Sequence, residues 1–205
     1  MDRLIIEFDK ALRTVFAPAP TVRERPGCAQ SEADLTERER RHAAALMRIN
    51  HCGEICAQAL YQGQALTSRN PGTKLALDHA AWQETEHLNW TEKRIEELGG
   101  RKSVLNPLWY AGSLAIGVTA GLMGDDWSLG FLAETEKQVE HHLDQHLASL
   151  PVSDIRSQEI VARMRDDEIA HADTAISLGA RDLPFPIKLA MKVISKVMTN
   201  TAYRL

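Results

Sequence analysis

Two short stretches of the sequence, QETEHL at residues 83–88 and DEIAHA at residues 167–172, follow the same pattern. Each holds a Glu followed three residues later by a His: Glu84 with His87, and Glu168 with His171. Residues three apart lie side by side on a helix, so both members of a pair can reach the same metal ion. One such pair is most often part of a solvated helix face, whereas two pairs on core-facing helices indicate a metal site.

Both pairs lie on apolar stripes with helical spacing. In the later segment the stripe consists of Val161, Met164, Glu168, His171, Ala175 and Leu178. In the earlier segment it consists of Leu77, Ala81, Glu84, Leu88, Thr91, Ile95 and Leu98, with His87 beside it. A carboxylate in a core stripe is costly unless it is paired or bound to a metal. The two Glu residues therefore favour a buried polar site.

The rest of the chain is also predicted to be helical, because no segment shows sustained strand alternation. Asp34 or Thr36 is the expected cap of the first long helix, and Asn70-Pro71-Gly72 is its expected stop. The predicted helices span about 2–16, 35–68, 73–98, 126–150, 153–178 and 187–203. Four of them are long, which predicts an all-α four-helix bundle.

Residues 1–33 are expected to stand apart from a single domain formed by residues 34–205. Within them, residues 2–16 are predicted to form an amphipathic helix whose apolar face holds Leu4, Phe8, Leu12 and Val15. Residues 17–33 contain three Pro and one Gly, which is typical of a linker.

A bundle that holds two carboxylate-bridged metals needs one more Glu from each of the other two long helices. On the first long helix, Glu54 is the only acidic residue between residues 39 and 78. On the third, Glu136 lies within the apolar stripe, Glu134 lies outside it, and Glu140 is the fallback. A lone Glu followed by a Glu-x-x-His pair thus occurs twice along the chain. This order predicts a pseudo-symmetric site with one His for each of two metals.

The ligand set also favours particular metals. Four carboxylates and two imidazoles suit iron or manganese, whereas zinc prefers fewer oxygens or some thiolate. Histidine ligands usually donate their other ring nitrogen to an outer partner. Asp167 is predicted to hold His87 in this way, and Gln83 is predicted to hold His171.

Three further residues near the site have two interpretations each. His51, three residues before Glu54, competes as a ligand or is an outer, packed polar residue. His142 follows Glu136 among several histidines that are expected to be solvated or hydrogen-bonded, and it is the candidate among them for an outer role. Tyr61, two turns beyond Glu54, is interpreted as core, with an outer role near the metals as the alternative.

The composition is that of one folded domain, with 205 residues, 44 % hydrophobic and 25 % charged. A net charge of −4 gives no electrostatic support for nucleic-acid binding. Three Cys without a second Cys pair argue against structural zinc and favour free thiols in a reducing compartment. The N-terminus lacks the layout of a signal or transit peptide, so a cytoplasmic protein is expected.

One stretch, SVLNPLWYAGSLAIGVTAGLMG at residues 103–124, carries no charge. Its length suits a membrane span, but Asn106, Pro107, Ser113 and four Gly favour a buried or membrane-embedded helix that does not cross. The stretch is also the expected crossover between the second and third long helices. Its Gly117 and Gly121 permit close helix contact.

The last predicted helix carries Lys188, Lys192 and Lys196 in a basic stripe, with apolar residues on another face. Such a helix either lies in a membrane interface or packs on the bundle with its Lys in water. Next to the uncharged stretch, the first interpretation is favoured. Segments 107–124 and 187–203 are therefore expected to face a membrane.

With these residues in place, the sequence resembles the demethoxyubiquinone (demethoxyubiquinol) hydroxylases of ubiquinone biosynthesis. The matching pieces are INHCGE, YQGQ, WQETEHL, NPLWYAGSLAIGVTAGLMG, ETEKQVEHH and RDDEIAHADTA. They run in the family's order from about residue 47 to the C-terminus, and their combination is specific. Cys52 stands where the family more usually has Ala.

The resemblance implies a ferritin-like bundle with two iron ions per chain, held by Glu54, Glu84, His87, Glu136, Glu168 and His171. It implies that Glu84 and Glu168 bridge the irons, and that Glu54 and Glu136 bind at the ends. The implied reaction is O2-dependent hydroxylation of the benzoquinol ring of a polyprenylated demethoxyubiquinol (2-polyprenyl-3-methyl-6-methoxy-1,4-benzoquinol).

The implied setting is peripheral, on membrane lipid at the cytoplasmic face of the inner membrane, with no nucleic-acid partner. The electron donor, NADH or the quinol itself, stays open, and no Gly-rich dinucleotide fingerprint appears. A homo-oligomer is also left open.

Three rival functions remain on the sequence alone. A ferritin-like or rubrerythrin-like protein for iron storage or peroxide detoxification shares the ligand set, but it needs neither the uncharged insert nor the basic last helix. A di-iron hydroxylase of a modified tRNA base is disfavoured by the net charge. The third rival is a metal-free membrane adaptor in which the buried Glu and His are only hydrogen-bonded.

Overall fold

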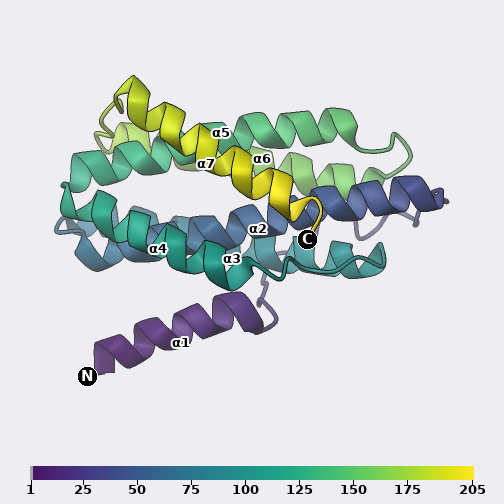
Figure 1. The fold of residues 1–205 in the computed structure, drawn as a ribbon, viewed down its shortest axis with the longest axis horizontal. Helices are drawn as coiled ribbons and strands as arrows, with labels where there is room; N and C mark the ends of the chain where they lie inside the picture. The colour runs from purple at the N-terminus through teal and green to yellow at the C-terminus, as the bar shows by residue number, and fades with distance from the viewer. Residues whose placement is uncertain (1) are drawn as a thin grey trace.

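The computed structural model describes the backbone of residues 2–205 and the side chains from residue 5 onward. These residues form seven helices and no strand (Figure 1). The helices are α1 (Asp2–Phe16), α2 (Glu37–Thr67), α3 (Pro71–Glu97), α4 (Asn106–Leu122), α5 (Asp125–Ser149), α6 (Ile155–Ser177) and α7 (Phe185–Ala202). The predicted all-α class is confirmed.

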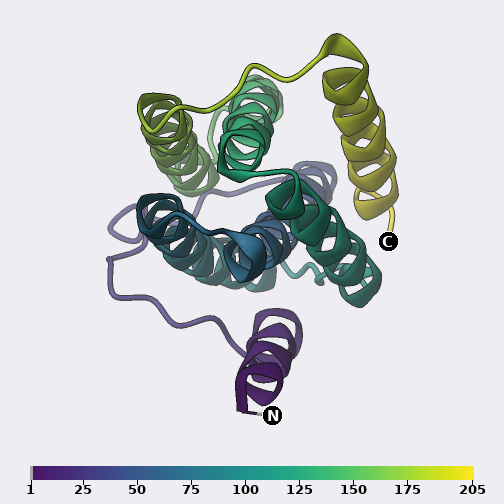
Figure 2. The ribbon, with the colours of Figure 1, turned by 90° about the vertical axis from the view of Figure 1, so that its left-hand side faces the viewer.

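The four long helices form the predicted bundle. Helices α2 and α3 form one antiparallel pair, and α5 and α6 form the other. The pairs meet where α3 packs on α6 and α2 packs on α5, as the end-on view of Figure 2 shows. This is a ferritin-like arrangement, in which all four helices turn one stripe toward a common axis.

Side-chain caps explain where three of the four long helices begin. Thr36 caps α2 in a reciprocal capping box with Glu39, as one of the two expected caps. Asp154 caps α6 by accepting a hydrogen bond from the Ser157 amide. Helix α2 ends at Thr67, just before the expected stop at Asn70-Pro71-Gly72. The same segment also begins the next helix, because Asn70 Oδ1 accepts from the Gly72 and Thr73 amides and caps α3. Helix α3 therefore begins at Pro71, two residues earlier than predicted.

Helix α4 is the predicted crossover, and it lies along α2. A Cβ on Gly117 would meet the Leu60 carbonyl oxygen at 2.1 Å, and one on Gly63 would meet the Leu114 carbonyl oxygen at 2.5 Å. Glycine is required at both positions because the two backbones touch. The close helix contact that Gly117 was expected to permit is thus between α4 and α2, inside the domain.

Apolar side chains are exposed on the three helices outside the bundle. Among the described residues, no helix is both long enough and apolar enough to span a membrane. Helices α4 and α7 cover the side of the bundle formed by α2 and α5, and α1 packs on α2 and α4 (Figure 2). Of the predicted apolar face of α1, Val15 is buried and Phe8 and Leu12 are exposed, while the Leu4 side chain lies outside the described residues.

The predicted core stripes are buried with few exceptions. Leu178, at the end of the α6 stripe, is 46 % exposed because it lies beyond the last turn of the helix. The three cysteines are free thiols, with Cys52 buried and Cys28 exposed.

Candidate metal centre

Six carboxylate and imidazole side chains converge in the middle of the bundle. They come from all four long helices: Glu54 on α2, Glu84 and His87 on α3, Glu136 on α5, and Glu168 and His171 on α6. None is more than 5 % exposed. Four buried carboxylates repel one another unless positive charge lies between them.

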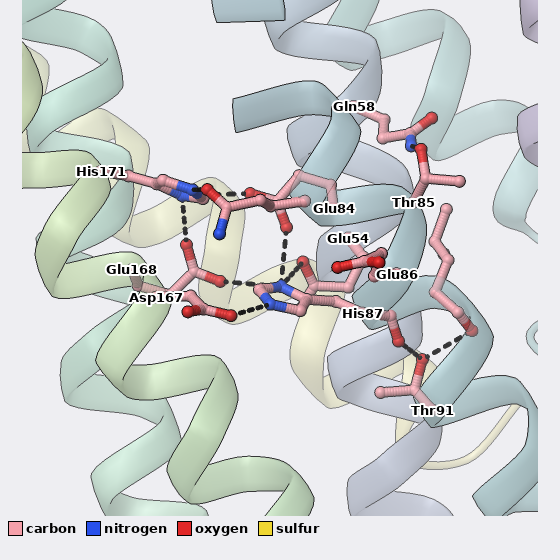
Figure 3. A network of polar contacts seen from close by, with 12 residues as sticks. Glu54, Gln58, Glu84, Thr85, Glu86, His87, Thr91, Asp167, Glu168 and His171 are labelled. Atoms are coloured by element: carbon pink, nitrogen blue, oxygen red, sulfur yellow. Dashed lines mark hydrogen bonds and ion pairs between the residues drawn. The ribbon is translucent and has the colours of Figure 1, made fainter. Parts of the chain in front are cut away.

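The first cluster, the His87 group, consists of Glu54, Glu84, His87 and Glu168. His87 Nδ1 lies 3.1 Å from Glu84 Oε2 and 3.3 Å from Glu168 Oε1. It lies 3.8 Å from Glu54 Oε2. Figure 3 shows the His87 ring pointing in between these three carboxylates.

The second cluster, the His171 group, consists of Glu84, Glu136, Glu168 and His171. His171 Nδ1 lies 3.1 Å from Glu168 Oε2, 3.2 Å from Glu136 Oε1 and 3.5 Å from Glu84 Oε1. The two clusters thus have the same composition, three carboxylates around one imidazole nitrogen. Glu84 and Glu168 belong to both.

The outer nitrogens of the two imidazoles are held by the residues that the sequence indicated. His87 Nε2 lies 3.0 Å from Asp167 Oδ2, and His171 Nε2 lies 2.8 Å from Gln83 Oε1. Both acceptors place the ring proton on Nε2. In the neutral form that binds metal, the Nδ1 lone pairs then face the carboxylate oxygens.

This donor set fits a pair of metal cations. Lone pairs on imidazole nitrogens and carboxylate oxygens converge from different helices with their ligand atoms within 4.8 Å of one another in each group. In addition, Glu84 Oε1 and Glu168 Oε1 are buried and accept no hydrogen bond. Both orphaned oxygens belong to the two shared residues, where a cation between the groups would bind.

The pKa shifts show how the cluster behaves without metal. Burial raises the pKa of Glu84 well above its ordinary value, and the charge of Glu168 adds to this effect. Burial and the charge of Glu168 raise the pKa of Glu136 to about 8. Burial alone would lower the pKa of His171, but hydrogen bonds to Glu136 and Glu168 raise it to about 11. Protons therefore take the place of metal cations between these groups.

Tyr61 has both of the properties weighed for it. Its side chain is fully buried in the core, and its hydroxyl donates a hydrogen bond to Glu136 Oε1. Burial and the charge of Glu136 raise the pKa of Tyr61 well above its ordinary value, so the phenol keeps its proton. The hydroxyl thus acts as a donor that orients Glu136.

His142 and His51 lie outside both clusters. The ring of His142 packs on that of His146, with 4.0 Å between their centroids, and His146 Nδ1 is 2.7 Å from Asn50 Oδ1. Burial, with the charge of His141, lowers the pKa of His142 to about 4. His51 is buried, and burial with the charge of Lys102 lowers its pKa to about 3. Neither histidine contributes a ligand atom to either group.

Glu86 and Arg23 are polar residues at this site that the sequence did not indicate. Glu86 is 1 % exposed, and Arg23, from the linker, bonds both Glu86 and Asp167. The only local signal was an acidic residue next to His87, which is equally common on solvated helices.

The profile of the family described as ubiquinone biosynthesis protein COQ7 matches residues 41–202. The chain belongs to the COQ7 family. Residues 1–40, which include α1 and the linker, lie outside the matched part.

Individual relatives match along 99–100 % of the chain. The chain is 63 % identical over 205 residues to a protein of Laribacter hongkongensis, with all of both chains covered. It is 64 % identical over 203 residues to a protein of Dechloromonas aromatica, covering 99 % of this chain and 98 % of the relative. It is 62 % identical over 203 residues to a protein of Nitrosomonas europaea, with the same coverage. All three are named 3-demethoxyubiquinol 3-hydroxylase.

Proposed function

We propose that this chain is an O2-dependent monooxygenase that hydroxylates the benzoquinol ring of a polyprenylated demethoxyubiquinol. The observation that carries the proposal is the pair of buried ligand groups that share Glu84 and Glu168. The family and the names of its full-length relatives supply the substrate class. Iron storage is disfavoured, since nothing in those names points to it.

Two iron ions per chain are the proposed cofactor. Glu84 and Glu168, which belong to both groups, would be shared by the two ions, Glu54 and His87 would hold one of them, and Glu136 and His171 would hold the other. A ferrous pair supplies two electrons for the reduction of O2. The Tyr61 hydroxyl, which donates to Glu136, would restrict the orientation of this ligand.

A cavity of about 510 Å³ gives a route to the centre for the quinol ring. It lies between α1, α2 and α3, and Tyr61, the residue that touches Glu136, is part of its lining together with Gln58 and Thr85. Its volume is in the range of small-molecule sites. The cavity lies beside α1, whereas the segments expected to face a membrane are those of α4 and α7.

Peripheral binding to the cytoplasmic face of the inner membrane is part of the proposal. On α7 five apolar side chains are 47–74 % exposed: Phe185, Leu189, Val193, Ile194 and Val197. On α4 Leu108 and Leu122 are more than 60 % exposed. Lys192 and Lys196 are exposed and can meet anionic headgroups, whereas Lys188 pairs with Asp182 at 2.6 Å.

The reaction is tested by a single turnover. Ferrous protein is mixed anaerobically with a short-chain demethoxyubiquinol and then exposed to isotopically labelled O2. We expect a product heavier by one labelled oxygen atom on the ring. Peroxide consumption or mineral growth with an unchanged quinol would instead support the storage function. Glu134→Gln, a change on α5 outside both ligand groups, serves as a control that keeps activity.

Membrane binding is tested separately with vesicles that contain anionic lipid. Val193→Glu and Leu108→Glu each remove an exposed apolar contact and add a charge, so we expect vesicle binding to weaken about 10-fold or more. Ile176→Glu is the matched control, because Ile176 is 47 % exposed on α6, on the opposite side of the bundle. Equal sedimentation of all variants with vesicles would contradict a membrane surface on α4 and α7.

A further inference from the structure

Arg23, from the linker between α1 and α2, reaches the surroundings of one imidazole. Its Nη1 donates to Asp167 Oδ2 at 2.8 Å, and its Nε donates to Glu86. Its guanidinium lies 4.7 Å above the centre of the Trp90 ring. The side chain is 26 % exposed, so most of it is shielded from water.

The contact continues directly to His87. Asp167 Oδ2, the oxygen that accepts from Arg23, also lies 3.0 Å from His87 Nε2. The centroids of the His87 and Trp90 rings lie 5.2 Å apart. Figure 3 shows Asp167 beside Glu168, with the two carboxylates contacting different ring nitrogens of His87. Arg23 and His87 thus share one carboxylate oxygen and one aromatic neighbour.

The linker is fixed at this place by a buried charge. Glu86 accepts hydrogen bonds from the backbone amides of Val22 and Arg23, at 3.1 and 2.9 Å, as well as from the Arg23 side chain. The Asn89 side chain donates to the Ala19 carbonyl at 2.6 Å. A carboxylate as buried as Glu86 is strongly destabilising without such donors. These hydrogen bonds therefore fix the linker, and with it Arg23, beside Glu86 on α3.

The other imidazole lacks this arrangement. His171 Nε2 is held by Gln83, a neutral amide, where His87 is held by an ionised carboxylate. Gln83 and Asp167 occupy the same position in the two repeats, directly before the paired Glu. A carboxylate on the outer nitrogen makes an imidazole a stronger metal ligand than an amide does. The repeats therefore differ at the residue that tunes each His.

We propose that Arg23 is a positioning residue that holds Asp167 against His87 and makes the His87 group the tighter of two unequal metal sites. The inference rests on the metal centre of the proposed function. It assigns a task to the linker: part of the chain outside the residues matched by the family profile completes the outer surroundings of one metal.

The test is a titration of the full-length metal-free protein with Co²⁺, followed by its visible absorption. We expect two Co²⁺ per chain with separable affinities. Asp167→Asn should weaken the tighter site about 10- to 100-fold, and Arg23→Ala should weaken the same site about 10-fold. If Arg23 acts through Asp167, adding Arg23→Ala to Asp167→Asn should weaken Co²⁺ binding at the His87 group little further. In Gln83→Ala, which changes the His171 group, Arg23→Ala should still weaken the His87 group by its full amount.

Arg25→Ala is the matched control. Arg25 lies on the same linker as Arg23 and pairs with Glu97 at 2.5 Å. Glu97 is on α3, like Glu86, but belongs to neither ligand group. Both Co²⁺ affinities should be unchanged in this variant. Arg23→Lys keeps a positive charge beside Glu86 but cannot donate to Glu86 and Asp167 together as the guanidinium does. Compared with Arg23→Ala, it should restore any lost stability but only part of the Co²⁺ affinity of the His87 group.

Two results would overturn the inference. One is an Arg23→Ala or Arg23→Lys protein that binds both Co²⁺ ions as the wild type does. The other is an equal loss at both sites, which indicates a general loosening of the bundle. A wild-type protein that takes up no Co²⁺ removes the metal centre itself, and this outcome is distinct from either of the first two.

Discussion

Replacing Glu168 by Gln is expected to remove both metal ions and to reduce quinol hydroxylation by about 1,000-fold or more. Glu168 lies within 3.3 Å of the Nδ1 atoms of both His87 and His171, and it belongs to both ligand groups. Outer partners of metal ligands change affinity by about 10- to 100-fold, and a ligand shared by two metals has a larger effect on each. Metal content by elemental analysis and single-turnover product are the measurements.

Two comparison variants make this result specific. Glu54→Gln should weaken one metal only, since Glu54 belongs to the His87 group alone. Glu134→Gln should leave both metals bound, because Glu134 contacts Gln138 and Lys188 instead. The metal-free Glu168→Gln protein should still fold, because Gln has the size of Glu and keeps a polar group beside both imidazoles. Two metals bound at wild-type affinity by Glu168→Gln would contradict a bridging role.

The convergence of the six candidate ligands follows from helical periodicity. A Glu in a stripe of Leu and Val must point into the core, and a His three residues on points the same way. The preference for Glu136 over Glu134 rested on this rule, and Glu136 is 1 % exposed whereas Glu134 pairs with Lys188 near the surface. Local spacing was therefore sufficient to bring these side chains together.

The contacts that the sequence did not indicate join distant segments. Arg23 is 63 residues from Glu86 and 144 residues from Asp167 along the chain, and no local pattern connects a linker arginine with either. His142 was a candidate for an outer role because it follows Glu136 on the same helix. In the structure its ring packs on that of His146 instead. Direction around a helix, and the path of a loop, depend on packing that spacing alone does not determine.

The metal-free protein should lose the stabilisation contributed by protonated Glu136 as the pH rises from about 5 to 8, while buried His51 and His142, whose pKa values are lowered, change stability in the opposite direction. Burial raises the pKa of Glu136 from 4.5 to about 8, and its carboxylate neighbours raise the pKa of His171 to about 11. A group whose pKa is raised on folding stabilises the folded state below its unfolded pKa, and this contribution is lost as the pH rises through the folded pKa. For Glu136 the loss is on the order of 3 kcal/mol, which lowers the melting temperature by about 10 °C.

Metal should reverse this pH dependence. Divalent ions replace the protons between the imidazoles and carboxylates, and their affinity increases as the ligands deprotonate. The metal-loaded protein is therefore expected to keep or gain stability over the same pH range. Thermal melts at several pH values, with and without metal, measure the difference, and Glu136→Gln should flatten the metal-free curve. A metal-free stability difference between wild type and Glu136→Gln that does not change from pH 5 to 8 would mean that Glu136 is not protonated in the folded state, and would contradict a cluster held together by protons in place of cations.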